Sequence, residues 1–199
     1  MSDDVLGPWD PLTPAAVAEL LEHCPAPWWI AGGYAIDAFV GQFDRRPHGD
    51  IDVGLLARDQ AAIRAVLAGW DLNCADPPGK LRLWHHGEVL EEPIHDVWVR
   101  EHPEGPWRLQ LVLNPAEHDD WIYRRDSRIR RRVEQITWRS DGIPYLAAEV
   151  QLLFKSKSVR PKDDRDFADS LPLLSAQQRR WLRRSLELSD FGHPWLDLV

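Results

Sequence analysis

The 199-residue sequence has few cysteines and no long apolar run. Two cysteines, Cys24 and Cys74, are too few for the disulfide framework of a small secreted protein, so we expect ordinary thiols in a reducing cytoplasm. No apolar stretch approaches the roughly eighteen residues that a membrane-spanning helix needs. The first residues are acidic and are interrupted by glycine and proline, unlike a signal peptide. We therefore expect a cytoplasmic protein with no membrane partner.

The sequence also lacks the positive charge of a typical nucleic-acid-binding protein. Its formal net charge is −8 at pH 7, whereas a surface that binds a phosphate backbone is normally basic. We therefore expect no nucleic-acid partner. An acidic cleft would concentrate a cationic small molecule, but a solvated acidic surface that keeps the protein soluble explains the same charge. The sequence leaves the oligomeric state open.

Lysine is scarce as well, because the chain has four lysines beside twenty arginines. Three of the four, Lys155, Lys157 and Lys162, fall within eight residues. A lysine ammonium is a compact, flexible point charge, so this cluster suggests a place where such a charge is needed. The helix dipole alone also favours lysine near a helix end, and chance clustering explains the same pattern.

Apolar patterning predicts an α/β core at residues 1–140 and a helical C-terminal part at 141–199. Thr13 and Pro14 have the residue types of a helix start, and the apolar run 28–31 indicates a buried strand. We expect a helix at 34–40, a strand at 50–56 and a helix at 59–67. Further strands are expected at 81–84, 94–99, 107–113 and 121–125, and further helices at 146–157, 163–171 and 175–188.

Asp50 and Asp52 stand two residues apart in the expected strand 50–56. Side chains two apart on a strand point the same way and lie about 6.5–7 Å apart at the backbone, so both carboxylates can face one site. Folding alone explains the pair poorly, because like charges repel and have low β-propensity. Hard carboxylate oxygens suit Mg²⁺, which completes its coordination with water and substrate phosphates, although a strand-end turn gives the same letters.

Gly32 and Gly33 follow an expected strand and precede an expected helix. Backbone N–H groups at such a helix start can bind phosphate oxygens, whereas a plain strand-to-helix turn would also use two glycines. The combination of strand, glycine pair, helix, polar loop and the pair Asp50 and Asp52 is more specific than any of its parts.

The segment AGGYAIDAFVGQFDRRPHGDIDVGLL resembles the aminoglycoside and lincosamide nucleotidyltransferases of the DNA polymerase β-like superfamily. The resemblance rests on the glycine pair, the triplet Ala35-Ile36-Asp37, the basic loop Arg45-Arg46-Pro47-His48 and the aspartate pair. A second segment, GIPYLAAEVQLLFKSKSVRPKDDRDF, is similar to the helical part of that family. The resemblance implies an α+β fold, with a mixed β-sheet flanked by helices and a small C-terminal helical part.

The resemblance also implies an activity, the transfer of a nucleoside monophosphate to a hydroxyl group of a small-molecule acceptor. The donor is usually ATP, which gives AMP and releases pyrophosphate with the help of Mg²⁺. Asp50 and Asp52 are then catalytic metal ligands, and the glycine pair with Lys155 or Lys157 contacts the nucleotide. The acceptor is aminoglycoside-like or lincosamide-like in that family, and the sequence itself names neither the acceptor nor which NTP is used.

A third carboxylate, acting as metal ligand or as base, is usual in this family, and two expected strands can supply it. In the strand 94–99, Asp96 shares a face with Ile94 and Trp98. In the strand 107–113, the equivalent position holds Gln110, which is no base and is a poor ligand for Mg²⁺. We favour Asp96 as the catalytic and metal-binding residue.

Two other functions remain open at this stage. If Gln110 holds the third position, the protein is a catalytically degenerate nucleotide-binding protein of the same fold. A metal-dependent hydrolase would instead use His95 and Asp96 together with His85 and His86. Hydrolases with a His-Asp doublet normally carry it on a helix, whereas I-H-D-V-W-V alternates like a strand, so we favour the nucleotidyltransferase.

Overall fold

A mixed β-sheet forms the centre of the protein. The structure is a computed structural model, in which residues 6–42 and 47–199 are described. Within these ranges, one sheet has eight strands in the order β10-β11-β1-β2-β6-β5-β3-β4. The strands are β1 (Trp28–Ile30), β2 (Asp52–Leu56), β3 (Asp71–Ala75), β4 (Leu81–Leu83), β5 (Asp96–Arg100), β6 (Leu109–Asn114), β10 (Thr137–Ser140) and β11 (Ile143–Leu146). The pairs β1–β11 and β2–β6 are parallel, and the other pairs are antiparallel. The α+β class with a mixed sheet is therefore confirmed.

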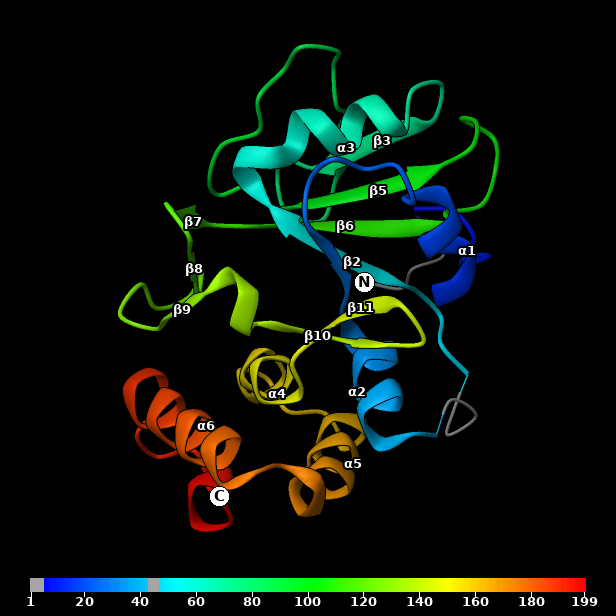
Figure 1. Ribbon diagram of the computed structural model, residues 1–199. Helices are drawn as coiled ribbons and strands as arrows, with labels where there is room; N and C mark the ends of the chain where they lie inside the picture. The colour runs from blue at the N-terminus through cyan, green and yellow to red at the C-terminus, as the bar shows by residue number, and fades with distance from the viewer. Residues whose placement is uncertain (1–5, 43–46) are drawn as a thin grey trace.

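Helices flank this sheet, and most of them gather on one side. They are α1 (Pro14–Leu20), α2 (Gly32–Val40), α3 (Gln60–Val66), α4 (Ala148–Ser156), α5 (Pro161–Ser170) and α6 (Ala176–Ser189). Figure 1 shows α3 with the upper strands, while α4, α5 and α6 form the lower half. A separate small sheet joins β7 (Ala116–Glu117), β8 (Asp120–Ile122) and β9 (Arg130–Arg132). No helix in the described part of the chain has the length and apolar character needed to cross a bilayer.

Thr13 and Pro14 start α1 as their residue types predict. The Thr13 side chain accepts a hydrogen bond of 3.2 Å from the Ala16 N–H, and Pro14 is the first helical residue. Proline costs nothing there because the N–H groups of the first turn have no intrahelical acceptor. Local sequence thus determines where α1 begins.

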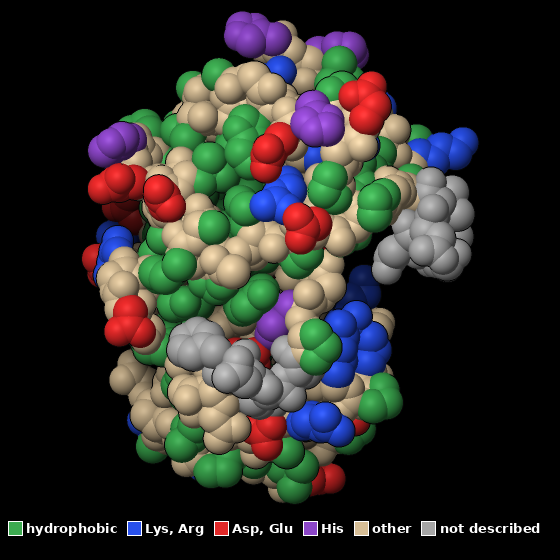
Figure 2. Space-filling model, turned by 90° about the vertical axis from the view of Figure 1, so that its right-hand side faces the viewer, with side chains coloured by type: hydrophobic (Ala, Val, Ile, Leu, Met, Phe, Trp, Pro, Cys, Tyr) green, Lys and Arg blue, Asp and Glu red, His purple; other side chains and the backbone are tan. Residues whose placement is uncertain are grey.

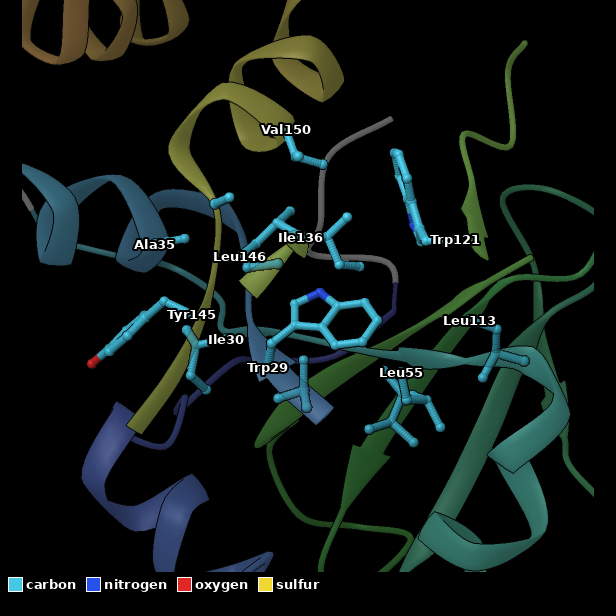
Figure 3. Packing of buried hydrophobic residues seen from close by; sticks show 14 of the residues in the cluster. Trp29, Ile30, Ala35, Leu55, Leu113, Trp121, Ile136, Tyr145, Leu146 and Val150 are labelled. Atoms are coloured by element: carbon cyan, nitrogen blue, oxygen red, sulfur yellow. The ribbon is translucent and has the colours of Figure 1, made fainter. Parts of the chain in front are cut away.

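The core of the sheet is built around Trp29, which is 1% exposed. Trp29 and Gly54 are paired residues of β1 and β2, and a Cβ atom at position 54 would overlap the indole ring. Glycine at that position therefore lets the ring lie flat against the neighbouring strand. Figure 3 shows Ile136, Leu146 and Leu55 around the ring and Val150 of α4 nearby, so residues from the sheet and from the start of the helical part share one core.

Several boundaries differ from the prediction. β2 begins at Asp52 and not at residue 50, so Asp50 precedes the strand. α2 begins at Gly32 and not at residue 34, so the glycine pair forms its first turn. The predicted domain boundary at residue 140 falls inside the β10–β11 hairpin, both strands of which belong to the central sheet. The turn residues Asp141 and Gly142 resemble a domain boundary in sequence but connect two paired strands. The helical part therefore begins at Ala148.

Candidate active site

Asp50 and Asp52 lie where the chain enters β2, beside the first turn of α2. Asp52 is the first residue of β2, and its backbone carbonyl accepts a hydrogen bond of 2.8 Å from the Ala31 N–H. Gly32 has a φ of +68°, and a Cβ atom at this position would overlap the Asp52 carboxylate. Glycine is therefore required at position 32 for its backbone conformation and for the close approach of Asp52.

The N–H group of Gly32 already has an acceptor. It donates a hydrogen bond of 2.8 Å to Oε1 of Gln151, a buried side chain of α4. The sequence predicts that both glycine N–H groups are open to phosphate, and this contact occupies one of them. Gly33 also lies in the first turn of α2, where N–H groups have no intrahelical acceptor. A direct phosphate contact from this pair therefore falls to Gly33.

A cavity of about 320 Å³, the lysine-lined cavity, lies beside Asp50 and Asp52. Its wall includes every site residue that the sequence predicts except Asp96, namely Gly32, Gly33, Asp50, Asp52, Lys155 and Lys157, together with Lys162. These residues come from α2, β2, α4 and α5, so folding brings the first and last thirds of the chain to one place.

The three clustered lysines have different surroundings. Lys155 is buried, and its Nζ lies 3.1 Å from Asp163 and 3.0 Å from Asp166. Lys157 and Lys162 are exposed at the wall of the lysine-lined cavity. Two of these lysines therefore present a charge to solvent, whereas the charge of Lys155 is compensated by two buried carboxylates.

The Asp163 carboxylate is held ionised by this arrangement. Burial alone would raise its pKa, but hydrogen bonds from Arg160 and Lys155 and the positive charge of Lys155 lower the pKa to about 2. The Arg160 Nε donates at 2.7 Å and the Lys155 Nζ at 3.1 Å. The contact between Lys155 of α4 and Asp163 of α5 holds the start of α5 against α4, next to the lysine-lined cavity.

A second cavity of about 230 Å³, the carboxylate cavity, lies on the other side of Asp52 and contains both candidates for the third position. Gln110 is the partner of Asp52 across the parallel β2–β6 pair. Asp96 begins β5, the next strand, and its Oδ1 accepts a hydrogen bond of 3.1 Å from Gln110 Nε2. Gln110 thus occupies the adjoining strand position, and Asp96 reaches the same cavity from one strand further away.

The electrostatics of Asp52 reflect all three carboxylates. Its pKa is raised from 3.8 to about 7, first by burial and then by the negative charges of Asp50 and Asp96. The charges of Lys155 and Lys162 act in the opposite direction. Burial and the negative charges of Asp50 and Asp96 make Asp52 hard to ionise. A bound cation would offset the repulsion among the three carboxylates, so the site favours cation binding.

The carboxylate oxygens at this site suit a hard divalent cation that takes only some of its ligands from the protein. In the described ranges, no group of three or more His, Cys, Asp or Glu side chains encloses a common metal position. Asp50 and Asp52 line the same cavity, and Mg²⁺ usually takes one or two protein carboxylates and completes its octahedron with water and substrate phosphates. The residues present therefore suit Mg²⁺ better than a metal that needs a full cage of protein ligands.

The lysine-lined and carboxylate cavities share a wall. The residues common to both are Gly32, Asp52, Arg125, Gln151 and Phe154. Arg125 is held in place by hydrogen bonds from its Nη1 to the Phe154 carbonyl (2.7 Å) and the Tyr123 hydroxyl (3.2 Å). Two molecules bound in the two cavities would both contact Asp52. Arg125 and Gln151 would supply hydrogen-bond donors in the same shared wall.

A protein-family model decides the family of this chain. The model describes aminoglycoside-2''-adenylyltransferases and matches residues 15–169, which include both cavities. The chain belongs to the aminoglycoside-2''-adenylyltransferase family. This family is one of nucleotidyltransferases, so the chain is placed among transferases, as the resemblance of its motifs implies.

Individual relatives agree with this family. A lincosamide resistance protein of Staphylococcus haemolyticus is 24% identical over 148 residues, which are 70% of this chain and 80% of that protein. Two solved structures are similar in fold. The crystal structure of ANT(2'')-Ia in complex with adenylyl-2''-tobramycin has 13% identity and a TM-score of 0.53 and covers 85% of this chain and 92% of that one. The solution structure of ANT(2'')-Ia has 16% identity and a TM-score of 0.56, with 87% and 88% covered.

Within this member of the family, sequence reasoning missed the side chains that support the site. Asp37, buried in α2, lies 2.6 Å from Nε2 of His48, and the His48 ring lies 4.0 Å from the Tyr34 ring. His48 also lines the lysine-lined cavity. The triplet that includes Asp37 signalled the family but not this contact, and Gln151 gave no signal because helical periodicity shows only that it is buried. Arg45 and Arg46 lie outside the described residues.

The histidines of the hydrolase alternative are dispersed in this family member. His95 Nδ1 lies 2.7 Å from the Pro93 carbonyl, and its Nε2 lies 3.4 Å from Asp96. His85 and His86 are exposed at the turn after β4. Among the residues that the structure describes, these histidines form no metal-binding group with Asp96.

The net negative charge of the chain does not make the face shown in Figure 2 uniformly acidic. Figure 2 shows acidic and basic side chains interspersed on one side of the molecule, with Lys and Arg gathered in its lower half. A larger cavity, of about 780 Å³, lies between α1 and the β10–β11 hairpin and includes none of Asp50, Asp52 and Asp96. Size and overall charge therefore do not locate the active site.

Proposed function

We propose that the protein transfers a nucleoside monophosphate, AMP from ATP, to a hydroxyl group of a small molecule in the presence of Mg²⁺. The observation that carries this proposal is the position of Asp52 in the shared wall of two cavities, one with exposed lysines and one with Asp96. Phosphoryl transfer depends on positioning and charge neutralisation, and this arrangement supplies both.

The lysine-lined cavity would hold the triphosphate. Lys157 and Lys162 are exposed there and are suited to neutralise phosphate oxygens as point charges. Asp50 and Asp52 would hold Mg²⁺, which supplies charge neutralisation on the phosphates when bound. Gly33 would add a backbone N–H at the start of α2. Lys155 would act mainly by holding α4 and α5 together below this cavity, since Asp163 and Asp166 already neutralise it.

The carboxylate cavity would hold the acceptor, with Asp96 as general base. Oδ1 of Asp96 accepts a hydrogen bond from Gln110 Nε2, and Oδ2, which lies 3.4 Å from His95 Nε2, would accept the proton. The acceptor hydroxyl gives this proton to Asp96 as its oxygen attacks the α-phosphorus. The new O–P bond forms while the bond to the bridging oxygen breaks, and pyrophosphate leaves with that oxygen.

Gln151 and Arg125 would stabilise the charge that develops on the transferred group. Both line the two cavities at once. The Oε1 of Gln151 is bound to the Gly32 N–H, which directs the other end of the amide, a donor, away from that contact. Donors fixed in this way act where charge accumulates in the transition state.

Pyrophosphate release tests this function. The purified protein with ATP, Mg²⁺ and a panel of hydroxylated acceptors, including an aminoglycoside and a lincosamide, is expected to release pyrophosphate with at least one acceptor. Asp50→Asn and Asp52→Asn keep the side-chain volume but remove the charge, and each should lower the rate at least about a hundredfold. Full activity in either variant would refute the assignment of the site.

One observation favours a second candidate, a nucleotide-binding protein without turnover. Gln110 is the residue paired directly with Asp52, where a carboxylate would complete the site from the adjoining strand. ATP binding without pyrophosphate release across the panel would favour this candidate. A Gln110→Glu variant that then gained activity would show that this position limits the chemistry.

A further inference from the structure

Arg124 is the half-buried arginine that separates the carboxylate cavity from a third cavity. The third cavity has a volume of about 330 Å³, and we call it the apolar cavity. Arg124 lines both. Its Nε is inaccessible to solvent and has no hydrogen-bond acceptor within the described ranges. Most other arginines near the site are paired with carboxylates or carbonyls, so among the described residues the Arg124 Nε stands out as a buried donor without an acceptor.

Arg124 and its neighbour Arg125 serve different sides of the site. Arg125 lines the lysine-lined cavity and is anchored to the Phe154 carbonyl. Arg124 does not line that cavity but lines the carboxylate cavity together with Asp96. The group that Arg124 would bind therefore belongs to the acceptor and not to the triphosphate.

The apolar cavity lies at the ends of β2 and β6, next to the start of β5. Its wall is mostly apolar and includes Ala57, Leu90, Pro93, Ile94, Leu113 and Pro115. The charged groups in this wall other than Arg124 are Arg58, which donates to the His118 carbonyl, and the exposed Glu92; the half-buried His95 also lines it. A ligand in this cavity would bury an apolar part against the wall and present an acceptor group to Arg124.

We propose that the acceptor is a hydroxylated molecule with an apolar body and a carboxylate or similar anionic group, which Arg124 binds. This inference rests on the proposed function. The hydroxyl would lie beside Asp96 in the carboxylate cavity, the anionic group beside Arg124, and the apolar body in the apolar cavity. A charge-assisted hydrogen bond to a half-buried guanidinium fixes such a molecule in one orientation.

A polycation fits these cavities poorly. Among the described residues, Asp52 and Asp96 are the carboxylates of the carboxylate cavity, and the proposed reaction uses both. The apolar cavity adds Glu92 alone, while Arg124 and Arg125 both line the carboxylate cavity with positive charge. Ammonium groups placed there would be repelled without a carboxylate left to pair with them.

Binding measurements separate this inference from the proposed chemistry. The protein is saturated with Mg²⁺ and a non-hydrolysable ATP analogue, and calorimetry then follows three sets of ligands. These are straight-chain 3-hydroxy acids of four to ten carbons, their methyl esters, and tobramycin. We expect one or more acids to bind about tenfold or more tightly than the matched ester, as one charged hydrogen bond allows, and more tightly than tobramycin.

Arg124→Gln and Arg125→Gln are the matched variants. Arg124→Gln should remove the preference for the acid over the ester and leave the affinity for the nucleotide analogue unchanged. Arg125→Gln should weaken binding of the analogue and retain the acid preference. Tighter binding of tobramycin, no acid that binds, or an acid preference that survives Arg124→Gln would each overturn the inference.

Pyrophosphate release with the bound acid and ATP then tests the function separately. If the acid binds through Arg124 but no pyrophosphate forms, the proposed function fails and the binding site stands. If tobramycin is adenylylated and no acid binds, the proposed function stands and the acceptor class is wrong.

Discussion

The lysine-lined cavity and the carboxylate cavity meet at Asp52 but are built from different parts of the protein. The lysine-lined cavity is formed by a loop, the start of α2, the C-terminal end of α4 and the start of α5, and it presents exposed charges. The second lies on the face of the sheet, with Asp96 and Gln110 on adjacent strands and apolar rings beside them. Charges on helix ends suit any triphosphate, whereas a shaped wall of strand residues selects one kind of acceptor. In the proposed reaction, the lysine-lined cavity would bind the nucleotide through residues that also carry the family resemblance, and the carboxylate cavity would select the acceptor.

The lysines give the largest expected effect that would test this comparison. Lys155→Met leaves Asp163 and Asp166 buried without their shared counter-charge, so we expect a loss of about 3–5 kcal/mol in the free energy of unfolding. Lys157→Met, on the same helix end but exposed, should change stability by no more than about 0.5 kcal/mol and should raise the KM for ATP. Urea denaturation measures the first effect and steady-state kinetics the second. Equal stability of the two variants would contradict the structural role of Lys155.

Gly32→Ala should strongly reduce activity by displacing Asp52. The new Cβ atom would overlap the Asp52 carboxylate, and the φ of +68° disfavours alanine as well. We expect nucleotide transfer to fall by about a hundredfold or more, as for other losses of a positioned charged group. Gly41→Ala is the matched control, because Gly41 has a φ of +74° but no atom near its Cβ position. If both variants lose activity equally, backbone strain and not the contact with Asp52 is responsible.

Gln151 links the two sides, and two substitutions separate its roles. Gln151→Leu leaves the Gly32 N–H without its acceptor, so we expect a loss of about 1–3 kcal/mol in stability and slower transfer. Gln151→Glu keeps an oxygen for Gly32 but removes the amide donor and adds a negative charge. Its stability should exceed that of Gln151→Leu, while kcat should fall at least about tenfold. A Gln151→Glu enzyme with normal kcat would show that the amide donor has no part in the reaction.

The smallest expected effect concerns pH and the shared wall itself. Because the pKa of Asp52 is raised from 3.8 to about 7, its ionisation opposes folding. Protonated Asp52 therefore contributes to the free energy of unfolding. This contribution is complete below about pH 4 and is lost as pH rises to about 7 and beyond. Without Mg²⁺, Asp52→Asn should therefore melt higher than the parent at pH 8, by roughly 2–4 °C if screening leaves about 1 kcal/mol, and show little difference at pH 4. A parent protein whose melting temperature does not depend on Asp52 at pH 8 would contradict the raised pKa.

The parts of the site that are local in sequence could be predicted, and the parts made by strand pairing could not. The Asp50 and Asp52 pair and the glycine pair lie within twenty-one residues of each other. Strand periodicity predicts both carboxylates on one face, and the two line one cavity although β2 begins only at Asp52. The choice between Asp96 and Gln110 depends on the order β2-β6-β5, which no spacing along the chain determines. The sequence poses them as alternatives, whereas the pairing makes them hydrogen-bonded neighbours.

Contacts within the helical part were likewise not predictable from spacing along the chain. The cluster of lysines near residue 155 is visible in the sequence, but α5 must fold back on α4 before Asp163 and Asp166 reach Lys155. The turn at Asp141 and Gly142 looked like a domain boundary because turn residues have the same signal inside a hairpin and between domains. Burial of Gln151 against Gly32 depends on α2 packing against α4, a contact between segments that are distant in sequence.

The hydrogen bond between Gly32 and Gln151 joins residues 119 positions apart, and this separation has a consequence for synthesis of the chain. β1 likewise lies between β2 and β11, and its Ile30 pairs with Tyr145. A nascent chain that has emerged only as far as β6 contains Asp50, Asp52 and Asp96, yet one edge of β1 still lacks β11 and the Gly32 N–H still lacks its acceptor on Gln151. Long-range contacts of this kind form slowly. Because Gln151 and Phe154 of α4 line both cavities, neither cavity can be complete before α4 has been synthesised.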